Sequence, residues 1–177
     1  MMSTQLIFVV ETNKKCDSDW IYIKNTVEHF YTWDSGNIKL TRVYMDGKNK
    51  YKSKEKEIQR NIKQFKQHSR NGESIVIYCF DCDNYDNNPL DKRFLEEASN
   101  YCRCLGYKFV WFCRDVEDVY LGRRIDSALK KKESAKFASN CKIKTVAERK
   151  LRSNHYVEKT SNILTILDEI SELKKRS

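Results

Sequence analysis

Two short, uninterrupted apolar segments constrain the fold of this chain more than any other feature of its sequence. Residues 5–10 read QLIFVV and residues 74–80 read SIVIYCF, without alternation between apolar and polar side chains. A strand with one face in water alternates, so continuous runs of Ile, Val and Phe predict strands buried on both faces. Such strands belong to parallel sheets that helices cover on each side, and the sequence therefore favours an α/β fold.

Helical patterns separate these strands. Apolar side chains recur at helical spacing over residues 18–32, and a basic helix capped by a serine is expected over residues 53–69. Asn88 and Pro89 open another helix, and Gly106 closes it. Two more strands are expected, at residues 38–45 and 107–113.

The alternation of strand and helix predicts a mainly parallel, four-stranded sheet flanked by helices. We assign residues 1–128 to this sheet-containing core. Residues 129–177 form a basic helical extension that we expect to pack on the core, and its last amphipathic helix spans the apolar residues between 163 and 173.

The composition excludes several classes of protein. Only 5 Gly and 1 Pro, with 12% aromatic residues, argue against a disordered or collagen-like chain. There is no stretch of about 18 apolar residues, so no membrane span is expected. The N-terminus lacks the basic region of a secretory signal, which indicates a cytoplasmic protein whose 7 Cys are reduced.

Positive charge is concentrated in two blocks. Residues 48–70 hold nine basic and two acidic side chains, residues 122–152 hold eleven and three, and the rest of the chain is acidic. The blocks favour a polyanionic partner, DNA or RNA, although charge runs are also common on solvated helix faces. The predicted nucleic-acid contacts are Lys52, Lys56, Arg60, Arg123, Arg124, Lys130, Lys131 and Lys132.

Three aromatic residues lie among or beside the basic side chains. Two roles are open to each of these side chains, which are Tyr44, Tyr51 and Phe137. Each could stack on a base or pack in the core, and core packing is the commoner role.

Acidic residues fall where the predicted strands end. Glu11 follows the first strand, Asp81 and Asp83 follow the third, and further acids including Glu117 follow the fourth. The carboxyl ends of parallel strands meet at one edge of a sheet, where crowded carboxylates repel unless a cation binds them. Oxygen ligands suit Mg²⁺ or Mn²⁺. If the strand continues through them, Asp81 and Asp83 point the same way, although a solvated turn also explains this pair.

Glu11 followed by Asp81-Cys82-Asp83 resembles the TOPRIM domain of topoisomerases, primases and OLD-type nucleases. The segment at residues 116–121 is similar to the acidic motif of OLD-type and RloB-like members, and the resemblance covers residues 5–128. It implies that Glu11 is a metal ligand or general acid/base, that Asp81 and Asp83 bind Mg²⁺, and that Glu117 is a further metal ligand.

The chain departs from the family pattern in the first loop. Thr12 stands where the family often has Gly, and the acid that usually follows has two candidates at longer spacing, Asp17 and Asp19.

Together these patterns predict a Mg²⁺-dependent nuclease that cleaves phosphodiester bonds, with Glu11, Asp81 and Asp83 as catalytic residues. The likeness to OLD-type proteins also implies a role in bacterial or phage defence. No Gly-rich phosphate loop is present, so an ATPase activity would have to come from a separate subunit. The alternatives are a catalytically inactive TOPRIM-like protein that binds nucleic acid or another partner, and, ranked lower, nucleotidyl transfer.

Overall fold

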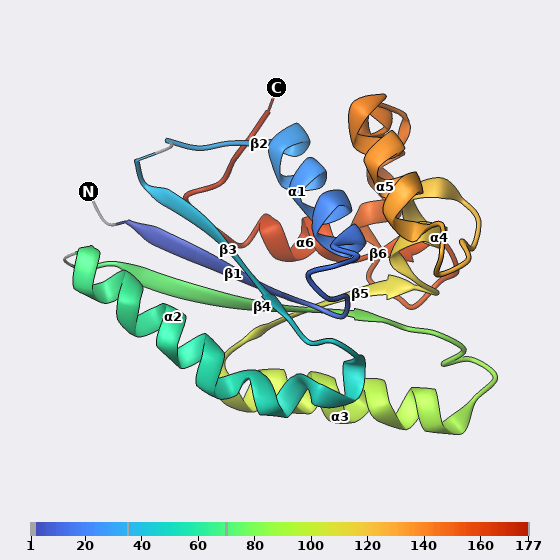
Figure 1. Cartoon of the computed structure of the whole chain (residues 1–177), viewed down its shortest axis with the longest axis horizontal. Helices are drawn as coiled ribbons and strands as arrows, with labels where there is room; N and C mark the ends of the chain where they lie inside the picture. The colour runs from blue at the N-terminus through green and yellow to red at the C-terminus, as the bar shows by residue number, and fades with distance from the viewer. Residues whose placement is uncertain (1–2, 35, 70, 177) are drawn as a thin grey trace.

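Over the described residues, 3–34, 36–69 and 71–176, the computed structural model contains a central five-stranded sheet (Figure 1). Arg70, the last residue of the first basic block, lies outside the described residues. The strand order is β3-β1-β4-β5-β6, and all neighbours are parallel except β5 and β6. The strands are β1 (Thr4–Val10), β3 (Ile38–Tyr44), β4 (Glu73–Asp81), β5 (Lys108–Cys113) and β6 (Thr160–Ser161). The α/β class is thus confirmed.

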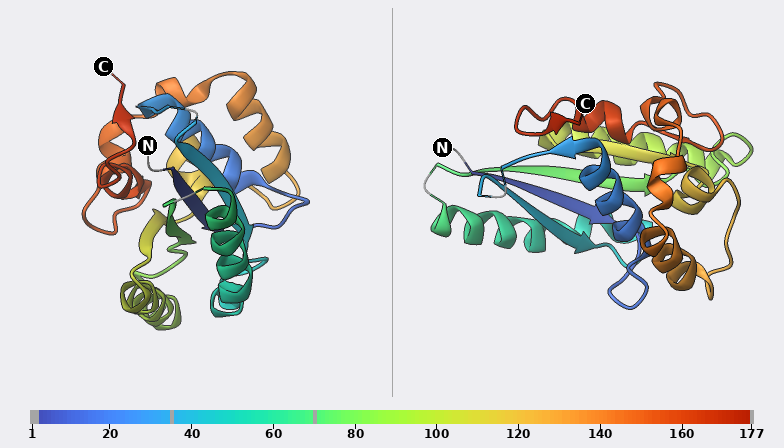
Figure 2. Two further views of the ribbon diagram at one scale, coloured as in Figure 1. Left: turned by 90° about the vertical axis from the view of Figure 1, so that its left-hand side faces the viewer. Right: turned by 90° about the horizontal axis from the view of Figure 1, so that it is seen from above.

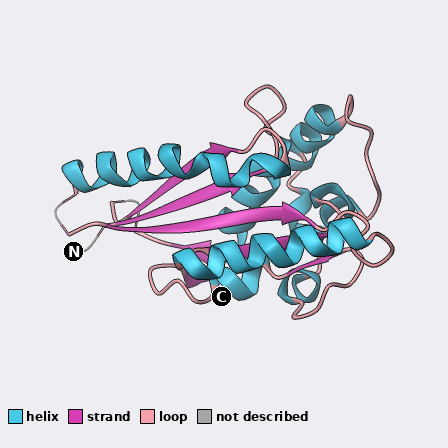
Figure 3. Cartoon of the chain, turned by 90° about the horizontal axis from the view of Figure 1, so that it is seen from below, coloured by secondary structure: helices cyan, strands magenta, loops and turns pink. Residues whose placement is uncertain are grey.

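Helices cover both faces of this sheet. Helices α2 (Glu55–His68) and α3 (Pro89–Leu105) lie on one face, as Figure 3 shows from below. The opposite face carries α1 (Ser18–Phe30), α5 (Lys130–Ser139) and α6 (Ile163–Leu167), and the two views of Figure 2 separate these layers. The short helix α4 (Val116–Leu121) follows β5. The remaining elements are strands β2 (Tyr31–Thr32) and β7 (Lys174–Lys175), which pair antiparallel, and 3₁₀ turns at Lys48–Lys54, Lys142–Thr145 and Glu148–Arg152.

The apolar runs are buried on both faces, as their lack of alternation predicts. Every residue of β1 is buried, and its side chains divide between two cores. Phe8 belongs to the core beneath α1 and α6, while Ile7 belongs to the core beneath α2 and α3. The predicted helix boundary at Asn88 is also correct, since the Asn88 side chain accepts a hydrogen bond from the Leu90 backbone N–H (2.9 Å).

The expected count of four strands is too low, because β6 has only two residues and no sequence pattern marks it. It is set against β5 by Asn162, whose side chain accepts from the Trp111 N–H (2.9 Å) and donates to the Phe109 carbonyl (3.0 Å). The last helix is also shorter than predicted. Helix α6 ends at Leu167, and turns keep Ile170 buried beyond it.

The segment from residue 129 onward packs on the sheet. Phe137, Leu151 and Leu164 are buried in the same core as Phe8. None of the helices in the described part of the chain has the length and apolar composition that crossing a lipid bilayer requires.

Candidate functional site

The carboxyl ends of β1, β4 and β5 are joined by acidic side chains. Glu11, one residue beyond β1, accepts a hydrogen bond from the Asp81 backbone N–H at the end of β4 (2.9 Å). The Asp81 carboxylate accepts one from the Val116 N–H, where α4 begins after β5 (3.1 Å). Two predicted site residues from distant parts of the chain therefore lie together, because the parallel register brings these strand ends to one edge.

Two further acids lie beneath this pair. Asp19, in the first turn of α1, is 3% exposed and accepts from the Thr12 N–H (3.2 Å) and from the Ser18 hydroxyl (3.3 Å). Glu117, in the first turn of α4, is fully buried, and its carboxylate lies 2.9 Å from the Lys130 ammonium. We call Glu11, Asp19, Asp81 and Glu117 the carboxylate cluster. Glu11 and Asp81 are its half-buried members.

The surroundings of the cluster disfavour negative charge on Glu11, Asp19 and Asp81. Burial of the carboxyl group, together with the charges of Asp19 and Asp83, raises the pKa of Glu11 to about 8. Burial and the charge of Glu117 raise the pKa of Asp19 to about 6, and burial and Glu11 raise that of Asp81 well above its usual range. At neutral pH the site therefore retains protons unless a cation balances the acids.

Lys130 supplies part of that positive charge. Burial alone would lower its pKa, but the ion pair with Glu117 and the charges of Asp81 and Asp19 raise it. The sequence placed Lys130 among the residues that contact nucleic acid. In the structure its ammonium group contacts a buried acid instead, because the start of α5 lies against the sheet edge.

Asp83 does not join the cluster. Strand β4 ends at Asp81, and Asp83 has a left-handed backbone with φ of 49°, so the alternation that would align Asp81 with Asp83 stops. The Asp83 carboxylate contacts the Lys48 ammonium, which also bonds Asp91 (3.1 Å). The side chain of Asp83 is 42% exposed and borders the site.

Of the two candidates for an additional acid, only Asp19 reaches the cluster. Asp17 turns instead to the β3 side, where its carboxylate accepts from the Tyr44 hydroxyl (2.7 Å) and pairs with Arg42 (3.3 Å). A helix that starts at Ser18 places Asp19 in its first turn, facing the sheet edge. The start of this helix is the sequence feature that favours Asp19 over Asp17 as the additional acid.

The basic blocks include helices on opposite faces of the sheet (Figure 1): the first comprises α2 and the 3₁₀ turn before it, and the second comprises α5 and the segments that flank it. Lys52, Lys56 and Arg60 are exposed, as are Lys131 and Lys132. Arg123 pairs with Glu133 (2.9 Å), and Arg124 donates to the Asn84 side chain (3.2 Å). Tyr51 and Phe137 are core residues, whereas Tyr44 is half-buried.

Within the part of the chain that the structure describes, no three His, Cys, Asp or Glu side chains form a ready-made metal-binding group. The chain matches no protein-family model, and no similar protein was found among curated proteins or among solved structures.

Proposed function

We propose that this protein is a Mg²⁺-dependent nuclease with a TOPRIM-like core that cleaves phosphodiester bonds in DNA or RNA. The observation that carries the proposal is the carboxylate cluster, in which the Lys130 ammonium pairs with Glu117 and its charge also acts on Asp19 and Asp81, within a chain of net charge +9. Acids whose pKa values are shifted by burial and by like charges are typical of catalytic sites. An anionic substrate held by basic flanks accounts for the opposite charge of the rest of the surface.

The donor atoms suit a hard divalent cation. All are carboxylate oxygens, and Mg²⁺ is commonly held by one or two carboxylates, with water and substrate phosphate oxygens completing its shell. A preformed set of three ligands is therefore not required. Glu11 and Asp81, which are half-buried, would hold Mg²⁺ or Mn²⁺, with Asp19 and Glu117 beneath them. The bound cation would neutralise charge on the phosphate and lower the pKa of a water molecule.

The side chains of the protein have separate tasks in this proposal. Without a cation, Glu11 holds a proton near neutral pH, since its pKa is raised to about 8, and it would release that proton on binding the metal. Backbone N–H groups fix the carboxylates of Glu11 and Asp81. Asp83 would enter the site only if its ion pair with Lys48 opened. The residues proposed to hold the nucleic-acid backbone are Lys52, Lys56, Arg60, Arg123, Arg124, Lys131 and Lys132.

The test is cleavage of plasmid DNA and of RNA with Mg²⁺ or with EDTA. We expect Mg²⁺-dependent cleavage, and we expect Asp81→Asn to lower its rate by about a hundredfold or more, the effect of losing one key electrostatic group. The matched control is Asp86→Asn, an exposed acid in the loop that follows β4, where it pairs with Arg114 (3.2 Å). Equal rates for Asp81→Asn and the wild type would contradict the residue assignment. If neither Mg²⁺ nor Mn²⁺ supported cleavage, the proposed nuclease activity would be contradicted.

One observation favours a second function, that of a non-catalytic nucleic-acid-binding protein. The ammonium groups of Lys130 and Lys48 already contact Glu117 and Asp83, so part of the acidic charge is balanced without a metal. Calorimetric titration with Mn²⁺ separates the two functions. A nuclease should bind Mn²⁺ and lose this binding in Asp81→Asn, whereas a passive binder should release no heat with either protein.

A further inference from the structure

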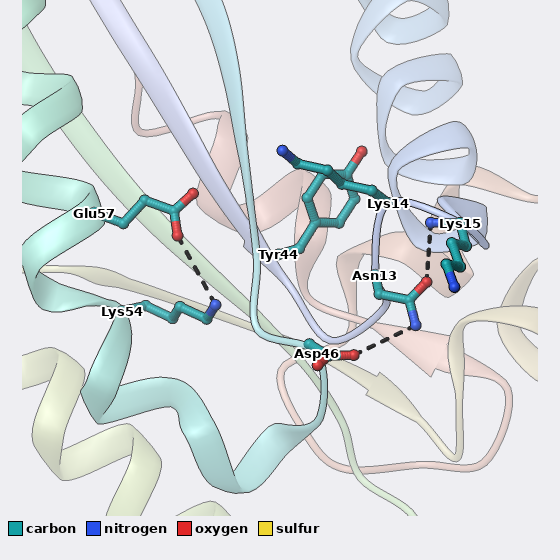
Figure 4. Close-up of a pocket in the computed structure, with 7 residues that line it drawn as sticks. All are labelled: Asn13, Lys14, Lys15, Tyr44, Asp46, Lys54 and Glu57. Carbon is teal, nitrogen blue, oxygen red and sulfur yellow. Dashed lines mark hydrogen bonds and ion pairs between the residues drawn. The ribbon is translucent and has the colours of Figure 1, made fainter.

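A surface hollow lies beside the carboxyl ends of β1 and β3 (Figure 4). Its walls come from three separate segments. Asn13 and Lys14 belong to the loop after β1, Tyr44 is the last residue of β3, and Lys54 and Glu57 stand at the start of α2.

The hollow and the cluster share one loop. The Thr12 N–H donates to Asp19 in the cluster (3.2 Å), and the next residue, Asn13, donates through its side chain to Asp46 at the hollow (3.4 Å). The Gly47 N–H also donates to the Glu11 carbonyl (3.0 Å). The position of the hollow relative to Glu11 is therefore fixed by hydrogen bonds on both sides of the loop.

The charge at the hollow suits an anion. Its acids are already paired, since Asp46 contacts the Lys50 ammonium (2.9 Å) and Glu57 contacts that of Lys54 (3.9 Å). No ion pair involves Lys14 within the described residues. Figure 4 shows Lys14 and Lys54 at different walls of the hollow, with the Lys54 ammonium directed toward Glu57 of α2.

Tyr44 adds an aromatic surface to this hollow. Its hydroxyl is held by Asp17 (2.7 Å), and the Arg42 guanidinium lies 5.7 Å from the ring centroid over one face. The ring is therefore fixed in orientation and remains half-buried at the wall of the hollow. An oriented aromatic ring beside the ammonium groups of Lys14 and Lys54 is an arrangement that binds unpaired bases, because an unstacked base can stack on the ring while the lysines contact the neighbouring phosphate.

We propose that this hollow binds one nucleotide of a single-stranded nucleic acid, with its phosphate between Lys14 and Lys54 and its base on Tyr44. The inference rests on the proposed function, since it supplies the nucleotide that adjoins the scissile phosphate. It also makes the substrate a single strand or an unpaired end.

The test is fluorescence anisotropy with a fluorescein-labelled single-stranded oligonucleotide and the matching duplex, both in EDTA. Tyr44→Leu should weaken single-strand binding by about tenfold and leave duplex binding unchanged, while Tyr44→Phe, which keeps the ring, should bind the single strand as the wild type does. Lys14→Glu/Lys54→Glu should weaken binding further and lower the salt slope by about one to two. The matched charge control is Lys63→Glu/Lys66→Glu, farther along α2.

Unchanged single-strand affinity in Tyr44→Leu would overturn the inference, and so would an equal loss in the two charge-reversed proteins. Cleavage assays distinguish failure of the nucleotide-site proposal from failure of the proposed nuclease activity. Cleavage that needs Asp81 but is unaffected in the hollow variants would overturn only the nucleotide site. Single-strand binding that depends on the hollow, without any cleavage, would support the nucleotide site and contradict the proposed nuclease activity.

Discussion

The carboxylate cluster and the outer surface of α2 both crowd like charges, but their surroundings differ. In the cluster, Asp19 and Glu117 are buried, and Lys130 is their nearby cation. On α2, Lys56 and Arg60 are exposed and face water. Water and salt screen the repulsion on α2, whereas the protein interior does not screen it in the cluster.

The carboxylate cluster destabilises the fold and must be compensated by other interactions, whereas the basic surface of α2 has little effect on stability. The basic surface of α2 costs little, so its presence alone says little about function. The cluster works against folding, because carboxyl groups with raised pKa values resist ionisation in the folded state. Residues that oppose folding and yet are held in place by backbone hydrogen bonds are the stronger indication of a site.

The largest effect that would sharpen this comparison is expected from Lys130→Met. Removing the ammonium leaves the Glu117 carboxylate buried without its ion pair, which should lower the free energy of unfolding by about 3–5 kcal/mol. Urea denaturation measures this change. The double variant Lys130→Met/Glu117→Gln should recover most of the loss, and a single variant as stable as the wild type would contradict a tight buried pair.

The pH dependence of stability should be the next largest effect. The folded-state pKa of Glu11 is raised from 4.5 to about 8, so between these values the folded protein binds more protons than the unfolded chain. Stability from this group is therefore full below about pH 4.5 and is lost as the pH rises toward 8. Because Glu11 is only half-buried, we expect a loss of about 2 kcal/mol rather than the full linkage value.

Urea denaturation in EDTA from pH 5 to pH 8 measures this slope, and Glu11→Gln should make it less steep, with Asp19 and Asp81 accounting for the remainder. Mg²⁺ should restore more stability at pH 8 than at pH 5, since it binds the ionised acids. If the stability of the wild type depended on pH no more steeply than that of Glu11→Gln, the raised pKa of Glu11 in the folded state would be contradicted.

The smallest effect is expected on α2. Lys63→Gln/Lys66→Gln removes two positive charges from an exposed surface, and the free energy of unfolding should change by less than about 0.5 kcal/mol. Thermal denaturation at low and high salt measures it. A change comparable to that of Lys130→Met would show that the two regions do not differ as we describe.

The sequence predicted those parts of the structure that local pattern controls. Continuous apolar runs identified β1 and β4, and Asn88 with Pro89 identified the start of α3, because burial and helix capping depend on neighbouring residues. Glu11 and Asp81 could be placed at one edge because parallel strands share their polarity.

The remainder depends on contacts between distant segments. The turn of the backbone at Asp83 is coupled to an ion pair with Lys48, which no local pattern reveals. Lys130 looks like any residue of a basic helix, and only the packing of α5 against α1 brings it to Glu117. Two-residue β6 has no periodicity to detect, since it is held through Asn162.

The division of the core between the two faces also sets an order in which the nascent chain can fold. The layer of α2 and α3 is built from residues that precede Gly122, whereas the opposite layer needs Phe137, Leu151 and Leu164. As the polypeptide leaves the ribosome, one side of the sheet can close while the other still awaits its cover. Lys130 emerges in that interval, so the acids at the strand ends meet their cation only after the strands that carry them have been synthesised.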